Sequence, residues 1–255
     1  MVTRPDMDEL RRVCQPAATM DRRSGEHWLA RRWLRRFSLR LTALLVRTSV
    51  TPNQLTAVMI AVGLLAAVAA ALPGLAWAVV AALLVLVYFI LDCSDGEVAR
   101  WKRMTSVVGV YLDRVGHYVV EAALLVAYGF RAGGQEVGGW TTVGALGALF
   151  VVLVKAETDL VDTVRLRAGM AKVTDDKTEL RSARVGRMRR AASVLRIHQT
   201  TGALESVALL VVAAAVDFFA GGLAATRVLV AFLVAVAGTM VVLHLVSVLL
   251  SRRLR

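Results

Sequence analysis

Residues 75–103 read LAWAVVAALLVLVYFILDCSDGEVARWKR, an apolar run that ends in a group of charged residues. A helix needs about 20 mostly apolar residues to cross a hydrocarbon core about 30 Å thick, so this run predicts a membrane-spanning helix. Asp92 and Asp95 follow the run directly, and basic residues come next, up to Arg103. Because basic residues favour the cytoplasmic side, we expect the acidic pair at the cytoplasmic end of this helix.

The rest of the chain carries apolar runs of similar length. Together with 75–91, these runs are 55–72, 107–130, 141–161, 203–220 and 227–250. A chain of 255 residues with 57% hydrophobic residues in such runs is not a soluble globular protein. We expect an all-α membrane protein with six transmembrane helices. The net charge is +12, and the charged residues are clustered between the apolar runs. This distribution favours contact with membrane lipids and not with nucleic acid.

Six crossings place both ends of the chain on one side of the membrane. Basic residues crowd that side, in the stretches 31–47, 100–103, 165–196 and 252–255. The turns on the opposite side hold only Arg131 and Arg227. This asymmetry predicts a multi-pass integral membrane protein with both termini in the cytoplasm.

Three parts are expected along the chain. They are a polar N-terminal tail (1–25), an interfacial amphipathic helix (26–50) and a six-helix transmembrane domain (51–255) that would carry any catalytic site. In the second part, apolar residues recur every four positions, at Trp33, Phe37, Leu41 and Leu45, while arginines occupy the other faces. The charged N-terminus indicates no cleaved signal peptide. With only Cys14 and Cys93, we expect neither a disulfide framework nor a cysteine metal site.

Acidic residues near the cytoplasmic ends of the second and third predicted helices suggest a metal site. Asp92 and Asp95 share a helix face at spacing i, i+3, and Asp113 and His117 share one at i, i+4. A short connection makes the two helices antiparallel neighbours, so the faces can meet. Crowded carboxylates ionise with difficulty unless a cation neutralises them. Hard oxygen ligands favour Mg²⁺ or Mn²⁺, and two such ions can clamp a diphosphate.

The pattern DCSDGEVAR (92–100), eight residues, Gly109, three residues, Asp113, three residues and His117 resembles a known signature. The signature is that of the CDP-alcohol phosphotransferase family: Asp, two residues, Asp-Gly, two residues, Ala-Arg, eight residues, Gly, three residues, Asp, three residues and Asp. The stretch RTSVTPNQLT (47–56) is similar to the family's Thr-Pro-Asn entry to its first membrane helix. Six crossings are also the family's architecture.

This resemblance implies an enzyme of phospholipid biosynthesis. It would transfer a phosphoalcohol group, such as phosphatidyl, from a CDP-linked donor such as CDP-diacylglycerol to an alcohol acceptor and release CMP. Asp92, Asp95 and Asp113 would bind the metals, and the last motif residue would act as base and metal ligand. The residues implied at the nucleotide are Pro52, Asn53, Gln54, Leu55, Gly96, Arg100 and Ser106.

His117 stands where the family has its last aspartate, and three interpretations stay open. Histidine can replace the aspartate as base and metal ligand, because imidazole both accepts protons and binds metals. Glu121, one turn further along, can orient His117 or supply the missing carboxylate. The third interpretation is a catalytically silent homologue that binds a CDP-lipid. A cation-coupled transporter is a further rival, although its acids would be expected near the middle of the membrane.

The acceptor site is less well defined by the sequence. Lys155, Arg165 and Arg167 are the candidate contacts for a small alcohol or phosphorylated polyol, because phosphorylated acceptors need fixed positive charge. The alternative is that these residues only mark the cytoplasmic side. Either the donor or the acceptor can be the lipid. Small-residue pairs in the last predicted helix can support a homodimer, but the sequence assigns no oligomeric state.

Overall fold

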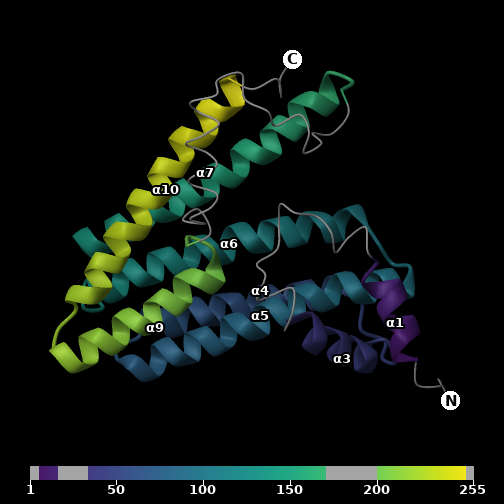
Figure 1. The fold of residues 1–255 in the computed structure, drawn as a ribbon, viewed down its shortest axis with the longest axis horizontal. Coiled ribbons are helices and arrows are strands. Elements are labelled where there is room, and N and C mark those ends of the chain that lie inside the picture. Colours follow the sequence, from purple (N-terminus) through teal and green to yellow (C-terminus); the bar gives the residue numbers. More distant parts are fainter. Residues whose placement is uncertain (1–5, 17–33, 171–199, 251–255) are drawn as a thin grey trace. The chain divides into compact units, whose positions relative to one another are not determined.

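The computed structural model describes residues 6–16, 34–170 and 200–250, and within these ranges it contains eight helices and no strand. The prediction of an all-α protein is therefore confirmed for the described part. The helices are α1 (Met7–Cys14), α3 (Arg35–Leu45), α4 (Pro52–Ala71), α5 (Leu75–Lys102), α6 (Val107–Ala132), α7 (Gly139–Arg167), α9 (Ala203–Ala220) and α10 (Ala224–Leu250) (Figure 1).

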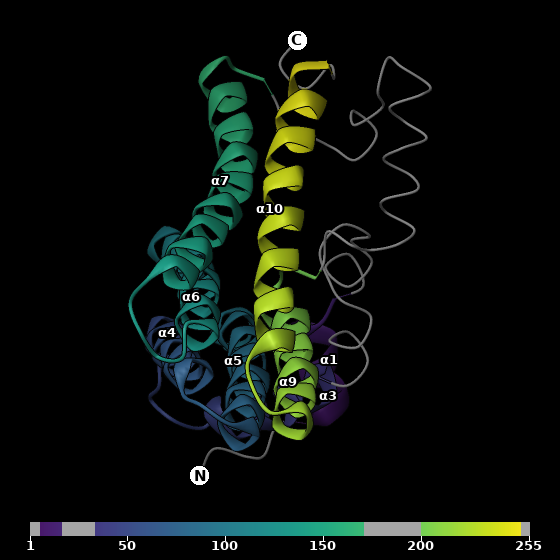
Figure 2. The same ribbon diagram turned by 90° about the vertical axis from the view of Figure 1, so that its left-hand side faces the viewer.

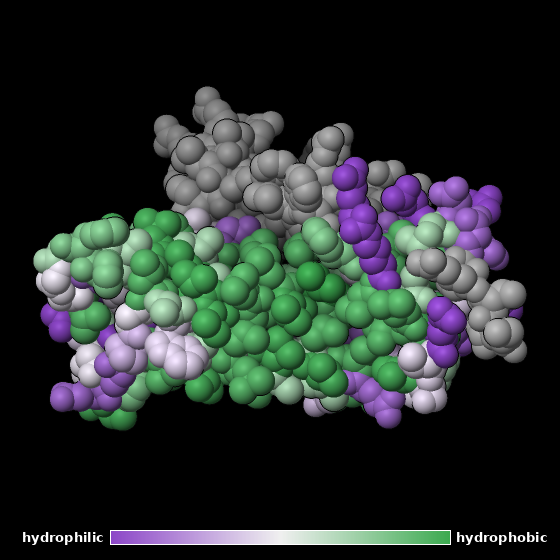
Figure 3. All heavy atoms as spheres, turned by 90° about the horizontal axis from the view of Figure 1, so that it is seen from below, coloured by the Kyte–Doolittle hydropathy of each residue, from purple (hydrophilic) through white to green (hydrophobic). Residues whose placement is uncertain are grey.

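Five of the described helices are long and apolar enough to cross a membrane, namely α4, α5, α7, α9 and α10. Large hydrophobic side chains are exposed along them, and Figure 3 shows such residues predominating over much of one face. This surface suits lipid as its solvent. The remaining long helix, α6, has 26 residues but carries Asp113, His117 and Glu121 in its interior. The sixth span and the cytoplasmic position of the termini stay predictions.

The N-terminal parts differ in detail from the expected organisation. Residues 7–14 of the expected polar tail form α1, whose Leu10 and Cys14 are fully buried. Leu10 and Cys14 pack with Leu39 of α3 in a small apolar cluster, and this packing accounts for the order of α1. Of the expected interfacial helix 26–50, residues 35–45 form α3, and residues 26–33, with Trp33, lie outside the described residues.

The chain divides into two compact units. Unit 1 comprises Met1–Ala66 and Val80–Val120, and unit 2 comprises Ala67–Val79 and Glu121–Arg255. Helices α4, α5 and α6 each contribute residues to both units. Unit 1 therefore contains the whole acidic motif.

Local sequence explains where α4 and α6 begin. Gln54 N–H donates to Thr51 Oγ1 (3.3 Å) and Thr51 N–H donates to Gln54 Oε1 (2.9 Å), a reciprocal cap in front of α4. Pro52 occupies the first helical position, where its missing N–H costs nothing. Ser106 caps α6 by accepting a hydrogen bond from Gly109 N–H at 3.0 Å.

Small residues bring α4 and α6 close together in unit 1. A Cβ atom on Gly63 would lie 2.5 Å from a methyl group of Val120, and one on Gly116 would lie 2.7 Å from Ile60 Cγ1. Neither position has room for a larger side chain. The two glycines therefore allow α4 and α6 to approach closely beside His117, which directly follows Gly116.

In unit 2, α7 lies beside α10, as Figures 1 and 2 both show. A Cβ atom on Gly147 would lie 2.8 Å from Val234, so glycine again allows the close approach. Asp217 at the end of α9 accepts hydrogen bonds from the backbone N–H groups of Ala225 (2.8 Å) and Thr226 (2.9 Å). These bonds satisfy the N-terminus of α10 and fix the turn between the helices.

Candidate active site

The side chains of Asp92 on α5 and of Asp113 and His117 on α6 meet within unit 1. One ligand atom from each lies within 4.8 Å of the other two. His117 Nε2 is 3.1 Å from Asp92 Oδ1 and 3.5 Å from Asp113 Oδ1. All three side chains are partly exposed. The structure thus brings together the two helix faces that the spacing of the acidic residues predicted.

Asp95 lies beside this group but has a different setting. Its residue is buried, with 8% exposure, and Thr56 Oγ1–H donates to its Oδ2 at 2.6 Å. Thr56 comes from α4, so Asp95 links the motif helix α5 to the first predicted span. Asp95 does not join the three atoms that lie within 4.8 Å of one another. Sequence reasoning missed Thr56, although its position five residues after Thr51 placed it on the same helix as the Thr-Pro-Asn motif.

Both ring nitrogens of His117 have partners. Nε2 faces the two aspartates, while Nδ1 is 2.7 Å from the hydroxyl oxygen of Tyr88. Tyr88 is fully buried, and its ring contacts the imidazole edge-on at a centroid distance of 5.8 Å. Tyr88 was also missed from the sequence. The available signal was its place four residues before Asp92, on the same face of α5.

The carboxylate of Glu121 pairs with Lys155 Nζ at 2.8 Å, within unit 2. The expected contribution of Glu121 to His117 stays a prediction, and the described partners of the two His117 nitrogens are Tyr88, Asp92 and Asp113.

The three acceptor candidates on α7 have different environments. Lys155 forms the ion pair with Glu121, Arg165 is buried and Arg167 is exposed. A second polar pair that the sequence analysis did not identify lies nearby on the same helix, where Glu157 Oε2 is 2.9 Å from His244 Nδ1 of α10. Polar groups inside membrane helices usually pair in this way, because lipid offers them no partner.

The residues expected at the nucleotide divide into two sets. Pro52 and Leu55 are buried at the start of α4, and Gln54 is used in the cap. Asn53 lies close to α6, because a Cβ atom on Gly109 would be 2.9 Å from Asn53 Oδ1 and 3.2 Å from Ser106 Oγ. The starts of α4 and α6 therefore meet at Gly109.

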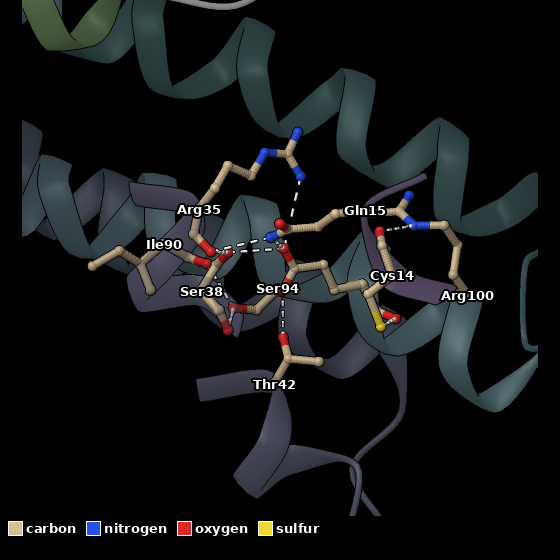
Figure 4. Close-up of polar contacts among 9 residues, drawn as sticks. Cys14, Gln15, Arg35, Ser38, Thr42, Ile90, Ser94 and Arg100 are labelled. Carbon is tan, nitrogen blue, oxygen red and sulfur yellow. Dashed lines mark hydrogen bonds and ion pairs between the residues drawn. The ribbon is translucent and has the colours of Figure 1, made fainter. Parts of the chain in front are cut away.

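Arg100 and Gly96 form the other set, on α5. A Cβ atom on Gly96 would lie 3.3 Å from Arg100 Nη1, so the guanidinium passes over this glycine. Arg100 Nε–H donates to the carbonyl oxygen of Cys14 at 2.7 Å (Figure 4). The last residue of α1 therefore holds Arg100 in the described arrangement.

Glu97 is a fully buried carboxylate in the middle of the motif that sequence reasoning did not single out. Its Oε1 accepts hydrogen bonds from Gln15 Nε2 (2.7 Å) and Ser38 Oγ (2.9 Å), and its Oε2 accepts one from Thr42 Oγ1 (2.8 Å). Arg35 Nη1 lies 3.8 Å from Oε1. Figure 4 shows Gln15, Ser38 and Thr42 pointing toward one another. Glu97 thus joins both N-terminal segments to α5.

Cys14 is enclosed by the same contacts. Its thiol donates to the carbonyl oxygen of Glu97 at 3.4 Å. Burial and the negative charge of Glu97 raise the pKa of the Cys14 thiol to about 11, with Arg100 acting in the opposite direction. Cys14 is therefore a structural thiol at neutral pH.

Comparison with protein families matches residues 49–197, more than half of the chain, to the CDP-alcohol phosphatidyltransferase family. The chain belongs to this family. Among curated proteins, it resembles the "Bifunctional IPC transferase and DIPP synthase" of Thermococcus kodakarensis, with 32% identity over 136 residues. That match covers 53% of this chain and 30% of the relative, so the shared part is less than a third of the relative's length.

Family membership confirms the resemblance that the motif indicated. The matched range contains Asp92, Asp95, Asp113 and His117, as well as Thr56 and Tyr88.

Proposed function

We propose that this family member transfers a phosphatidyl group from CDP-diacylglycerol to a hydroxyl of a small alcohol or phosphorylated polyol and releases CMP. The observation that carries this proposal is the meeting of Asp92, Asp113 and His117 within 4.8 Å, on the residues of the family motif. The reaction would serve phospholipid biosynthesis, with the site facing the cytoplasm. The reversed arrangement, with a soluble CDP-alcohol and a lipid acceptor, would use the same residues.

The donor set fits a divalent cation. Two carboxylates and an imidazole nitrogen converge, and oxygen ligands of this kind suit Mg²⁺ or Mn²⁺. Asp92, Asp113 and His117 would hold the ion, and Asp95 would hold a second one or complete the first site. When bound, the metal would neutralise the diphosphate and stabilise the departing CMP.

The contacts of His117 indicate which residue binds the metal and which accepts the proton. Nδ1 is engaged by Tyr88, so Nε2 is the ring nitrogen that faces the acids. One lone pair on Nε2 can bind a metal or accept a proton, but not both at once. A carboxylate has two oxygens and can do both. We therefore assign the ligand role to His117 and proton acceptance to Asp113, which is the more exposed aspartate of the two facing His117.

The proposed step conserves atoms and charge. The acceptor hydroxyl oxygen forms a bond to the phosphorus that carries the diacylglycerol group, and the bond from that phosphorus to the CMP oxygen breaks. CMP leaves with the electron pair, and the hydroxyl proton goes to Asp113. Lys155, Arg165 and Arg167 are proposed to attract a phosphorylated acceptor, with Lys155 exchanging its partner Glu121 for the acceptor phosphate.

The test is CMP release by the purified protein in lipid, with CDP-diacylglycerol, Mg²⁺ or Mn²⁺ and a panel of acceptors. We expect Asp113→Asn to lower kcat by about 10²- to 10⁴-fold, as for loss of a general base. His117→Ala should raise the metal concentration needed for activity. If no acceptor or CDP-alcohol gives CMP release while nucleotide still binds with metal, the chain is the silent CDP-lipid-binding homologue that the substituted motif position also allows.

A further inference from the structure

The ring of His117 has two possible orientations, related by a half-turn about the Cβ–Cγ bond. In the described one, Nδ1 meets the Tyr88 hydroxyl at 2.7 Å and Nε2 meets Asp92 at 3.1 Å. The half-turn would exchange each nitrogen with a ring carbon, so both contacts would be lost. The Tyr88 hydroxyl therefore selects the orientation that presents a nitrogen to the acids.

The same hydroxyl can also stay hydrogen-bonded to Nδ1 when Nε2 loses its hydrogen and binds a metal ion. A phenol can accept a hydrogen bond from Nδ1–H or donate one to unprotonated Nδ1. When Nδ1 carries the hydrogen of a neutral ring, the lone pair on Nε2 points toward Asp92 and Asp113, as a metal ligand requires. The ring can therefore exchange a hydrogen on Nε2 for a metal ion without turning.

Packing alone does not explain a tyrosine at position 88. The residue is fully buried in α5, and a Cβ atom on Gly63 would lie 3.0 Å from its ring, so the ring already fills the space between α4 and α6. Phenylalanine would fill that space equally well. The hydroxyl adds a polar group to an apolar interior, and such groups are retained where they have a partner.

We infer that Tyr88 is a positioning residue for His117, and that the Tyr88–His117 pair takes the place of the carboxylate at the last motif position. This inference rests on the proposed metal-dependent function. It assigns His117 to metal binding through Nε2, with Tyr88 acting only through the imidazole.

The experiment compares Tyr88→Phe with Tyr128→Phe in the full chain, reconstituted in lipid nanodiscs. Tyr128 is a matched control because it is also fully buried and loses a single described hydrogen bond, to Ser206 Oγ at 3.1 Å. Manganese affinity is measured by electron paramagnetic resonance, without substrate. We expect Tyr88→Phe to raise the Kd for Mn²⁺ by about 10- to 100-fold, as for loss of a partner behind a metal-bound histidine, and Tyr128→Phe to leave it within about twofold.

A second comparison removes the histidine. In His117→Asp, which restores the family residue, adding Tyr88→Phe should no longer change the Kd for Mn²⁺, because a carboxylate does not need the phenol to orient it. A loss of affinity that persists with Asp at position 117, or that is equal in the two tyrosine variants, would overturn the inference in favour of general packing. An unchanged Kd in Tyr88→Phe would also overturn it.

CMP release measured on the same samples separates this inference from the proposed function. If the wild-type chain releases CMP and Tyr88→Phe binds Mn²⁺ normally, the inference fails and the function stands. If the wild-type chain releases no CMP but Tyr88→Phe weakens Mn²⁺ binding, the positioning role stands and the transferase proposal fails. Absence of Mn²⁺ binding by the wild-type chain would overturn both.

Discussion

At the scale of single residues, neighbouring acids on α5 have unlike roles because each faces a different partner. Asp92 faces His117, Asp95 accepts a hydrogen bond from Thr56, and Glu97 accepts from the two N-terminal segments. Successive residues of a helix point in directions about 100° apart, so three acids within six positions can reach three different elements. The motif therefore combines a candidate reactive face with a structural one.

The reactivity of Cys14 measures how well the contacts around Glu97 bury this thiol. The folded pKa of about 11 exceeds the usual 9.0, so the thiol stays protonated through neutral pH. In a Cys93→Ser variant, alkylation of Cys14 by iodoacetamide should be slow between pH 7 and 9 and should rise toward pH 11. The unfolded thiol ionises first, so this group's contribution to stability is present below about pH 9 and is lost as the pH rises through 11. Alkylation at pH 8 as fast as that of a free thiol would contradict the described burial.

At the scale of helices, the structure depends on contacts that local sequence does not reveal. The capping pair Thr51 and Gln54 and the apolar runs can be recognised from the sequence, and the helices follow them closely. The carboxylate of Glu97 instead finds Gln15 at a separation of 82 residues and Ser38 at 59. No spacing rule connects residues so far apart, so this cluster could not be predicted.

Loss of Glu97 is expected to release α1. Glu97→Ala would remove the acceptor of Gln15, Ser38 and Thr42, and buried polar groups without a partner cost about 1–3 kcal/mol. We expect Cys14 in this variant to be alkylated at least about 10-fold faster at pH 8, because α1 opens locally. Glu136→Ala, at an exposed position in unit 2, is the control. Equal rates in Glu97→Ala and the parent would show that other contacts hold α1.

The close approach of α4 and α6 gives a second prediction for these elements. Gly116→Val would force side-chain atoms into Ile60 and Met59, since even a Cβ atom would lie 2.7 Å and 3.0 Å from them. Overpacking of this kind costs about 1–3 kcal/mol, so the Tm in detergent should fall. The matched substitution Gly139→Val, at a position with no atom within 4 Å of its Cβ, should change the Tm much less. Similar Tm values for the two variants would argue against the tight crossing.

For the molecule as a whole, the number of membrane crossings depends on whether α6 spans the membrane. With six spans, the turns at the two ends of α6 lie on opposite sides of the membrane; if α6 does not cross, they lie on the same side. Met104 and Val137 are exposed residues in these turns. In a chain without Cys14 and Cys93, a membrane-impermeant maleimide should label Val137→Cys in intact cells and Met104→Cys only after permeabilisation. Labelling of neither position before permeabilisation would favour five spans.

Sequence patterns predicted the helical class and six apolar spans, five of which are long and apolar enough to cross a membrane in the described helices. They also predicted one group of Asp92, Asp95, Asp113 and His117, and the structure brings together Asp92, Asp113 and His117. These features follow from periodicity and from short separations along the chain. Tyr88 was hidden within an apolar run, where an aromatic residue usually contributes only packing. Its contact with His117 depends on how α5 and α6 pack, which the sequence pattern does not reveal.

The glycines between α4 and α6 also constrain how this protein can vary during evolution. A methyl group at position 63 would lie 2.5 Å from Val120, and one at position 116 would lie 2.7 Å from Ile60. The residues of each pair cannot both become larger, so the two positions are expected to covary among homologues. A sequence with alanine at position 63 should carry a smaller residue at 120. Because His117 adjoins Gly116, substitutions that alter the candidate site must arise within a neighbourhood that tolerates little change in volume.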